Sequence, residues 1–335
     1  MKAQSSTGQK RITKPQLMQL HNILISGFML IFCTTSFAQP QAAGDPFKLI
    51  SSEAVNYLNP KWSPDGSTLA FSSDNFDGIW LVDADGGNMR LLNTGSGIGF
   101  GYIWSPGGDF ILGRASHFIN QRRFQDIKVI NVKNGEAEIL VNQARGIRTL
   151  PAWSHNGANI ALPIGGEFEY LTSDKLQQKA LPAKSANTVF AILDKLYAAD
   201  TESRTESLIA EFDGRNIFGL SVSPNGEKAV FQVGGKGLHL VNTDGSGLQH
   251  IGYAEQPTWT PDGKYVIATL LEDNGYIITS GELYAIDANT GEQFHLTAHT
   301  PVIAMNPSVS PCGKWVAFDN PDDGNIYIME IISNF

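Results

Sequence analysis

Six basic side chains gather in one stretch of an otherwise acidic sequence. They are Arg114, His117, Arg122, Arg123, Arg145 and Arg148, while the whole chain has a formal net charge of −9. Arginine binds carboxylate and phosphate groups through paired hydrogen bonds. Tyr102, Phe100 and Phe118 lie nearby in sequence and offer rings on which a sugar can stack. The stretch therefore predicts a binding site for an acidic glycan or for an acidic segment of a partner protein.

A second interpretation of these basic residues stays open. Arginines on loops are often simply solvated, and Asp126, Glu167 and Glu169 are close enough in sequence to offset their charge. In that case the cluster forms no site.

Motifs that would indicate catalysis are missing from the sequence. It contains no G-x-S-x-G nucleophile elbow, no H-E-x-x-H, no C-x-x-C pair and no P-loop. The seven histidines are scattered, and only His117 and His299 fall in loops that we expect on one face, at the mouth of a central channel. We therefore expect a protein that is not an enzyme. The alternative is a carbohydrate-active lyase or hydrolase at the channel mouth.

Two short acidic stretches resemble fragments of calcium-binding loops. They are Asp83-Ala84-Asp85-Gly86 and Asn320-Pro321-Asp322-Asp323-Gly324. Both also fall where hairpin turns are expected, and aspartate, asparagine and glycine are the ordinary residues of such turns. We expect turns and no cofactor, with calcium as the alternative.

One five-residue unit recurs six times and organises the chain. It is Trp-Ser-Pro-Asp-Gly at residues 62–66 and returns, with substitutions, at 104–108, 153–157, 222–226, 259–263 and 309–313. Proline and aspartate favour the central positions of a tight turn, and glycine supplies the positive φ that the last position needs. Apolar residues alternate after most units, as in Leu69-Ala70-Phe71. Each unit therefore predicts a strand, a turn and a returning strand.

A second hairpin follows most of these units. Asp85-Gly86, Asp244-Gly245 and Thr290-Gly291 lie between alternating runs and are typical of hairpin turns. Four strands in roughly 40 to 50 residues are typical of one β-propeller blade. We therefore predict an all-β, six-bladed propeller over residues 47–335, after a short linker at 39–46.

The first residues of the propeller are expected to close the ring. The last repeat ends without enough residues for an outer strand, and Phe47 to Ser51 precede the first repeat as an outer strand would. We predict that they pair with Ile326 to Glu330, which removes two exposed sheet edges.

The third repeat is longer than the others, because Gly157 and Gly226 are 69 residues apart. We interpret residues 167–191 as an insertion in blade three. Insertions in repeat folds often lie on the binding face, although a surface loop without function is the alternative. His155 replaces the proline of its unit, which we interpret as a tolerated substitution in an exposed turn.

The first 38 residues have the pattern of a secretory signal peptide. Four basic residues precede an apolar run from Ile23 to Cys33, and Ser36-Phe37-Ala38 provides a cleavage site before Gln39. The run is too short to span a bilayer, and Met18 is an alternative start to Met1. Cleavage would leave a chain with 20 basic and 33 acidic residues. Such a charge argues against nucleic acid as a partner.

The repeat resembles that of the TolB-like propeller family. Residues Pro60 to Leu92 and Pro257 to Leu296 match its whole pattern of turn, strands and glycine turns. This repeat occurs in periplasmic translocation proteins, in propeller domains of prolyl-oligopeptidase-like enzymes and in some polysaccharide lyases. Unlike members with an N-terminal α/β domain, this chain has only eight residues between Ala38 and Phe47. The resemblance implies the propeller fold, and the missing N-terminal domain argues against a role in the Tol envelope system. From the signal-peptide pattern and the missing catalytic motifs we predict a periplasmic or secreted, monomeric, non-enzymatic module that binds an envelope protein or an acidic glycan.

Overall fold

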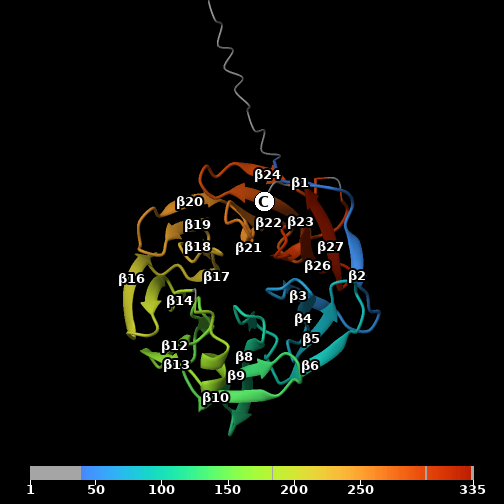
Figure 1. The fold of residues 1–335 in the computed structure, drawn as a ribbon. Helices are drawn as coiled ribbons and strands as arrows, with labels where there is room; N and C mark the ends of the chain where they lie inside the picture. Colours follow the sequence, from blue (N-terminus) through green and yellow to red (C-terminus); the bar gives the residue numbers. More distant parts are fainter. Residues whose placement is uncertain (1–38, 183, 299, 333–335) are drawn as a thin grey trace, which may run out of the picture. The chain divides into compact units, whose positions relative to one another are not determined.

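The computed structural model describes residues 39–182, 184–298 and 300–332, which lie within one compact unit. Seven antiparallel sheets follow one another around a ring (Figure 1). The prediction of an all-β propeller is confirmed, and the prediction of six blades is wrong. The expected signal peptide at 1–38, with its cleavage site, lies outside the described residues, as does His299.

The sheets have three to five strands each. The first contains β3 (Tyr57–Trp62), β4 (Thr68–Ser73), β5 (Gly78–Asp83) and β6 (Arg90–Thr94), and the second β7 (Ile103–Trp104), β8 (Phe110–Ile119), β9 (Arg122–Asn131) and β10 (Ala137–Ala144). The third contains β11 (Ala152–Trp153), β12 (Ile160–Ile164) and β13 (Glu167–Leu171), and the fourth β14 (Asn187–Ile192), β15 (Lys195–Asp200) and β16 (Thr205–Glu211). The fifth contains β17 (Ile217–Val222), β18 (Lys228–Val233), β19 (Gly237–Asn242) and β20 (Gln249–Gly252). The sixth contains β21 (Glu255–Trp259), β22 (Tyr265–Asp273), β23 (Ile278–Asp287) and β24 (Gln293–His295). The seventh contains β25 (Met305–Val309), β26 (Trp315–Asn320) and β27 (Asn325–Ile332), with β1 (Gln41–Ala42) and β2 (Phe47–Ile50).

Each recurring unit forms the turn between the first two strands of its blade. In the first copy, Asp65 Oδ1 accepts hydrogen bonds from Ser63 Oγ at 2.6 Å and from Ser67 N at 3.0 Å, and Gly66 has a φ of 73°. Successive turns also touch, because a β-carbon on Gly108 would lie 3.4 Å from Pro64 Cδ. The six turns therefore lie on one face of the ring, which we call the turn face.

The blade count differs from the prediction because one blade has no such turn. Residues 167–191, which we interpreted as an insertion, contain β13, the short helix α1 (Asp174–Gln178) and most of β14. The fourth sheet starts at Asn187, whose carbonyl accepts a hydrogen bond from His155 N on the turn face. Innermost strands elsewhere end on that face. β14 thus corresponds to a second strand that has taken the innermost place, between β11 and β17.

The predicted closure of the ring is confirmed. β2 pairs with β27 through Phe47 with Ile328, Lys48 with Tyr327 and Ile50 with Ile326. β1, in the segment that we expected to be a linker, pairs with the end of the same strand. Lys48 Nζ lies 2.9 Å from the carboxylate of Asp323.

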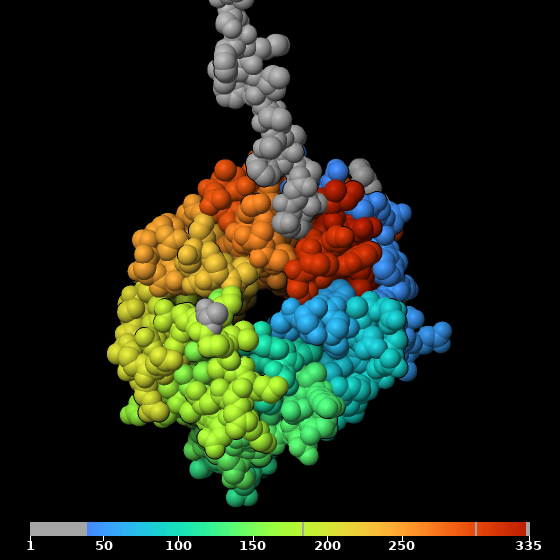
Figure 2. All heavy atoms as spheres, in the orientation of Figure 1, coloured from blue at the N-terminus to red at the C-terminus, as the bar shows by residue number. Residues whose placement is uncertain are grey.

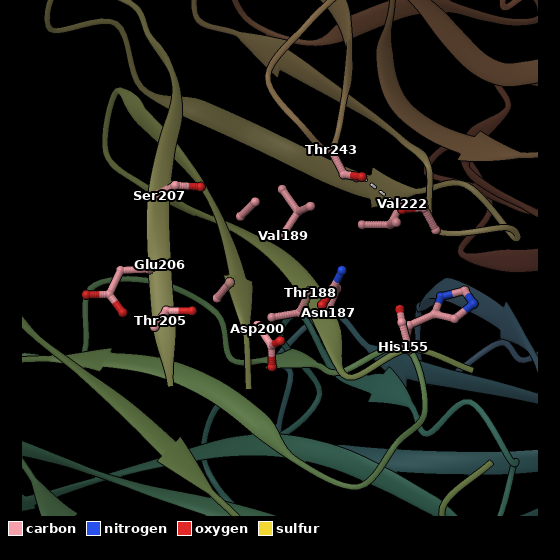
Figure 3. A pocket seen from close by; sticks show the side chains of 14 residues that line it. His155, Asn187, Thr188, Val189, Asp200, Thr205, Glu206, Ser207, Val222 and Thr243 are labelled. Carbon is pink, nitrogen blue, oxygen red and sulfur yellow. Dashed lines mark hydrogen bonds between the residues drawn. The ribbon is translucent and has the colours of Figure 1, made fainter. Parts of the chain in front are cut away.

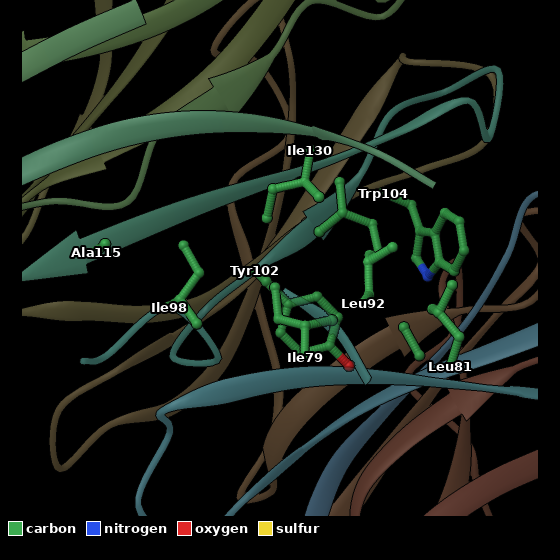
Figure 4. Close-up of a cluster of buried hydrophobic side chains, with 10 residues drawn as sticks. Ile79, Leu81, Leu92, Ile98, Tyr102, Trp104, Ala115 and Ile130 are labelled. Carbon is green, nitrogen blue, oxygen red and sulfur yellow. The ribbon is translucent and has the colours of Figure 1, made fainter. Parts of the chain in front are cut away.

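The core lies between neighbouring blades. Figure 4 shows one such cluster, in which Ile79 and Leu81 of the first sheet meet Tyr102, Trp104 and other apolar side chains of the second. Tryptophans of the recurring unit also hold blades together: Trp104 Nε1 donates to the carbonyl of Lys61 in the preceding blade at 3.0 Å. Each blade therefore depends on its neighbours for burial of its apolar face.

Candidate functional site

The face opposite the turn face carries most of the predicted site. It is formed by the turns between second and third strands and by the loops between blades, and we call it the hairpin face. Two of its hairpins exceed the others in length: β8–β9, with ten residues in each strand, and β22–β23, with nine and ten. They lie on opposite sides of the ring (Figure 1).

Both long hairpins carry exposed apolar side chains at their tips. Phe118 is 70% exposed beside the β8–β9 turn, and Tyr276 and Ile277 are 95% and 66% exposed in the β22–β23 turn. Both turns are defined structures, since Asn120 and Gln121 adopt positive φ and Asn274 Oδ1 accepts hydrogen bonds from Tyr276 N and Ile277 N. Tyrosine is enriched among the residues that contribute most of the binding energy at protein interfaces.

Four of the predicted arginines are exposed on this face. Arg122 and Arg123 begin β9 at the tip of the hairpin, and Arg145 and Arg148 lie in the loop that follows β10. Arg123 donates to Ser116 Oγ through Nε and Nη2, at 3.2 and 2.9 Å. In the part of the chain that the structure describes, none of the four forms an ion pair with a carboxylate. Glu167, Glu169 and Asp126 therefore do not pair with them.

Arg114 connects the β8–β9 hairpin to the loop that follows β10, and its side chain is less exposed than those of the other four arginines. Its Nη1 donates to the carbonyl of Thr149 at 3.0 Å, and its guanidinium lies 5.9 Å from the centre of the Phe100 ring. Burial, together with the charge of Arg123, lowers the pKa of Arg114. Arg114 therefore positions the base of the site.

Tyr102 does not belong to the binding surface. Its side chain is completely buried in the cluster of Figure 4, and its hydroxyl donates to the carbonyl of Asn59 at 2.7 Å. Burial raises the pKa of Tyr102 well above its usual value. The prediction of Tyr102 as a binding residue is wrong, because its aromatic ring packs between blades.

His117 lies on β8 near the hairpin tip, with its ring stacked on Phe124 at 6.1 Å and Nδ1 3.8 Å from Asp126. His299, which we expected beside it at the channel mouth, is not among the described residues. Within residues 39–182, 184–298 and 300–332, no three His, Cys, Asp or Glu side chains are placed to hold a metal ion.

The two stretches that resemble calcium-loop fragments form hairpin turns, as expected. Asp85 Oδ1 accepts from Gly87 N at 2.9 Å, and Asn320 Oδ1 accepts from Asp322 N at 3.1 Å. The carboxylate of Asp323 contacts Lys48 and accepts a hydrogen bond from the Tyr327 hydroxyl at 2.7 Å. These side chains stabilise their own turns and the ring closure.

Figure 2 shows an opening at the centre of the ring. Two ionisable groups, Asp319 and Lys61, are desolvated where the last and first blades meet. Asp319 is 4% exposed, accepts hydrogen bonds from Asn59 N at 2.8 Å and Asn306 Nδ2 at 2.9 Å, and has its pKa raised to about 7 by burial. Burial lowers the pKa of Lys61 to about 8. No sequence motif indicated either group.

Comparisons with known proteins concern the fold. Neither protein-family profiles nor curated proteins match the sequence. Among solved structures, the chain is similar to TolB from Acinetobacter baumannii, with a TM-score of 0.49 and 15% identity, over 83% of this chain and 64% of that one. The chain thus spans less than two thirds of the length of that structure, and the likeness is one of strand arrangement alone.

Proposed function

We propose that this chain is an exported, non-enzymatic binding module whose hairpin face holds an acidic segment of a partner protein. The observation that carries the proposal is the β8–β9 hairpin, which exposes Phe118, Arg122 and Arg123 at its tip. Neither arginine forms an ion pair with a carboxylate among the described residues. An apolar ring beside guanidinium groups suits a segment that alternates acidic and apolar residues.

The rest of the face supports the same function. Arg145 and Arg148 add positive charge on the adjoining loop, and Tyr276 provides a second apolar contact on the far side of the ring. Loops on a rigid scaffold are common carriers of recognition. Export rests on the signal-peptide pattern of residues 1–38, and no helix among the described residues has the length and apolar character needed to cross a membrane.

Reversing the charge at the hairpin tip is expected to weaken partner binding strongly. Arg122→Glu with Arg123→Glu replaces attraction of an acidic segment by repulsion, so we expect the Kd to rise at least about tenfold at low salt, with a smaller effect as ionic strength rises. The measurement is quantitative affinity enrichment from an envelope fraction of the source cells, followed by titration of the enriched partner.

The matched control is Lys133→Glu with Lys314→Glu, which makes the same charge change at exposed positions on the turn face. We expect it to retain the partner. Equal loss of binding in both double variants would show a general charge effect and would contradict a site on the hairpin.

A further inference from the structure

The missing turn of the fourth blade leaves a pocket on the turn face. Its volume is about 480 Å³, and its walls come from β14, β15 and β16 of the fourth blade and from the turns of the third and fifth blades. His155, in the slot that proline occupies in other copies, lies against Gly226 across the gap: a β-carbon on Gly226 would be 3.2 Å from His155 Nδ1. The pocket thus occupies the place where a seventh turn would lie.

Six of the fourteen lining residues have a hydroxyl or amide side chain. Figure 3 shows the side chains of Thr205 and Ser207 pointing into the space from β16, with Asn187 on β14 opposite them. Val189, Ala198 and Val222 provide apolar surface between these polar groups. Such a mixture suits a ligand that has many hydroxyls and also C–H faces.

Several polar groups of the lining have no protein partner. Among the described residues, the imidazole of His155, the amide of Asn187 and the hydroxyl of Ser207 form no hydrogen bond, whereas Thr188 Oγ1 and Thr243 Oγ1 donate to the carbonyls of Trp153 and Gly226. The unpaired groups supply both donors and acceptors. A ligand can therefore bind them without displacing contacts that the fold uses.

Charge in the pocket argues against an anionic ligand. Its charged lining residues are Asp200 and Glu206, which disfavour anions. Both carboxylates already accept hydrogen bonds within the protein: Asp200 Oδ1 from Glu202 N and Ser203 N, and Glu206 from the Tyr170 hydroxyl at 2.7 Å. Burial and the nearby Lys184 lower the pKa of His155, which leaves its ring neutral near pH 7.

We propose that this pocket binds an uncharged pyranose, either as a free sugar or as one residue of a glycan. The volume lies within the range of small-molecule sites, about 300 to 1,000 Å³. Asn187, Ser207 and His155 hydrogen-bond the sugar hydroxyls, and Val189 and Val222 contact its C–H face. The site is separate from the hairpin face and does not depend on the function proposed there.

The experiment is ligand-observed NMR and calorimetry on the whole chain, with glucose, galactose, mannose, N-acetylglucosamine and their oligomers as probes. We expect saturable binding of at least one of them, with a Kd of roughly 1 mM. Asn187→Ala with Ser207→Ala should weaken binding at least about tenfold. Both residues are exposed, so the double variant is expected to fold normally.

Two controls sharpen the result. Asn142→Ala removes an exposed amide outside the pocket, and Arg122→Glu with Arg123→Glu alters the hairpin face; neither should change sugar affinity. Tighter binding of an oligomer than of its monomer would identify a glycan residue as the ligand, and equal binding a free sugar. Absence of binding across all probes, or unchanged binding in the Asn187→Ala and Ser207→Ala double variant, would overturn the proposal.

Discussion

Replacing Ile50 by aspartate is expected to lower the free energy of unfolding by about 3 to 5 kcal/mol, because it places an unpaired charge in an apolar cluster. Ile50 is 6% exposed on β2 and packs with Ile326 and Ile328 of β27. Its strand closes the ring by pairing with β27. Weakening this pairing is therefore also expected to expose the edge of β27 and promote aggregation. Denaturant unfolding followed by tryptophan fluorescence measures the change.

The matched control is Ser51→Asp, which introduces the same charge at the next, exposed position. We expect it to unfold at nearly the wild-type denaturant concentration. Equal stability of Ile50→Asp and the wild type would mean that the ring does not depend on its N-terminal strand.

Asp319→Asn is expected to stabilise the protein at pH 8 and to lose this advantage as the pH falls toward 4. Burial raises the pKa of Asp319 from 3.8 to about 7. Between these values the folded state holds a proton that the unfolded state has released, so the wild type loses stability as the pH rises through this window. The difference between the folded and unfolded pKa values corresponds to about 4 kcal/mol of lost stability above pH 7. Asparagine avoids this loss because it carries no charge.

Urea unfolding of both proteins between pH 4 and pH 8.5 measures this effect. Asp322→Asn, at an exposed carboxylate three residues away, is the control and should show no such trend. An advantage of Asp319→Asn that is the same at pH 4 and pH 8 would show that the carboxylate does not titrate as its burial requires.

Local sequence patterns predicted most of the fold. The turn units, the alternating strands and the pairing of Phe47 to Ser51 with β27 depend on residues that are close in sequence or on the chemistry of sheet edges. The predicted number of blades was wrong because it was taken from the number of turn units. A turn unit marks a blade only where that blade has its first strand. Between Gly157 and Gly226 one blade lacks its outer strand and the next lacks its inner strand. The third blade therefore has a turn unit and the fourth has none.

The candidate site was predictable in part. The clustered arginines and Phe118 lie where alternation and turn residues put them, on a hairpin and the loop beside it. Tyr102 could not be separated from them by sequence, because packing against the neighbouring blade decides its burial. The pocket beside His155 could not be predicted from the sequence either, because it results from a turn that is absent. The histidine in place of proline was its one visible sign.

We expect the partner protein to sit on the hairpin face. Site-specific photocrosslinking in the source cells tests it most directly, with a photoreactive phenylalanine at Phe118, at Tyr276 and, as a control, at Leu248, which is exposed near the opposite face. We predict that positions 118 and 276 crosslink to the same protein and that position 248 does not. Crosslinks at 248 equal to those at 118 and 276, or none at either hairpin tip, would contradict the account.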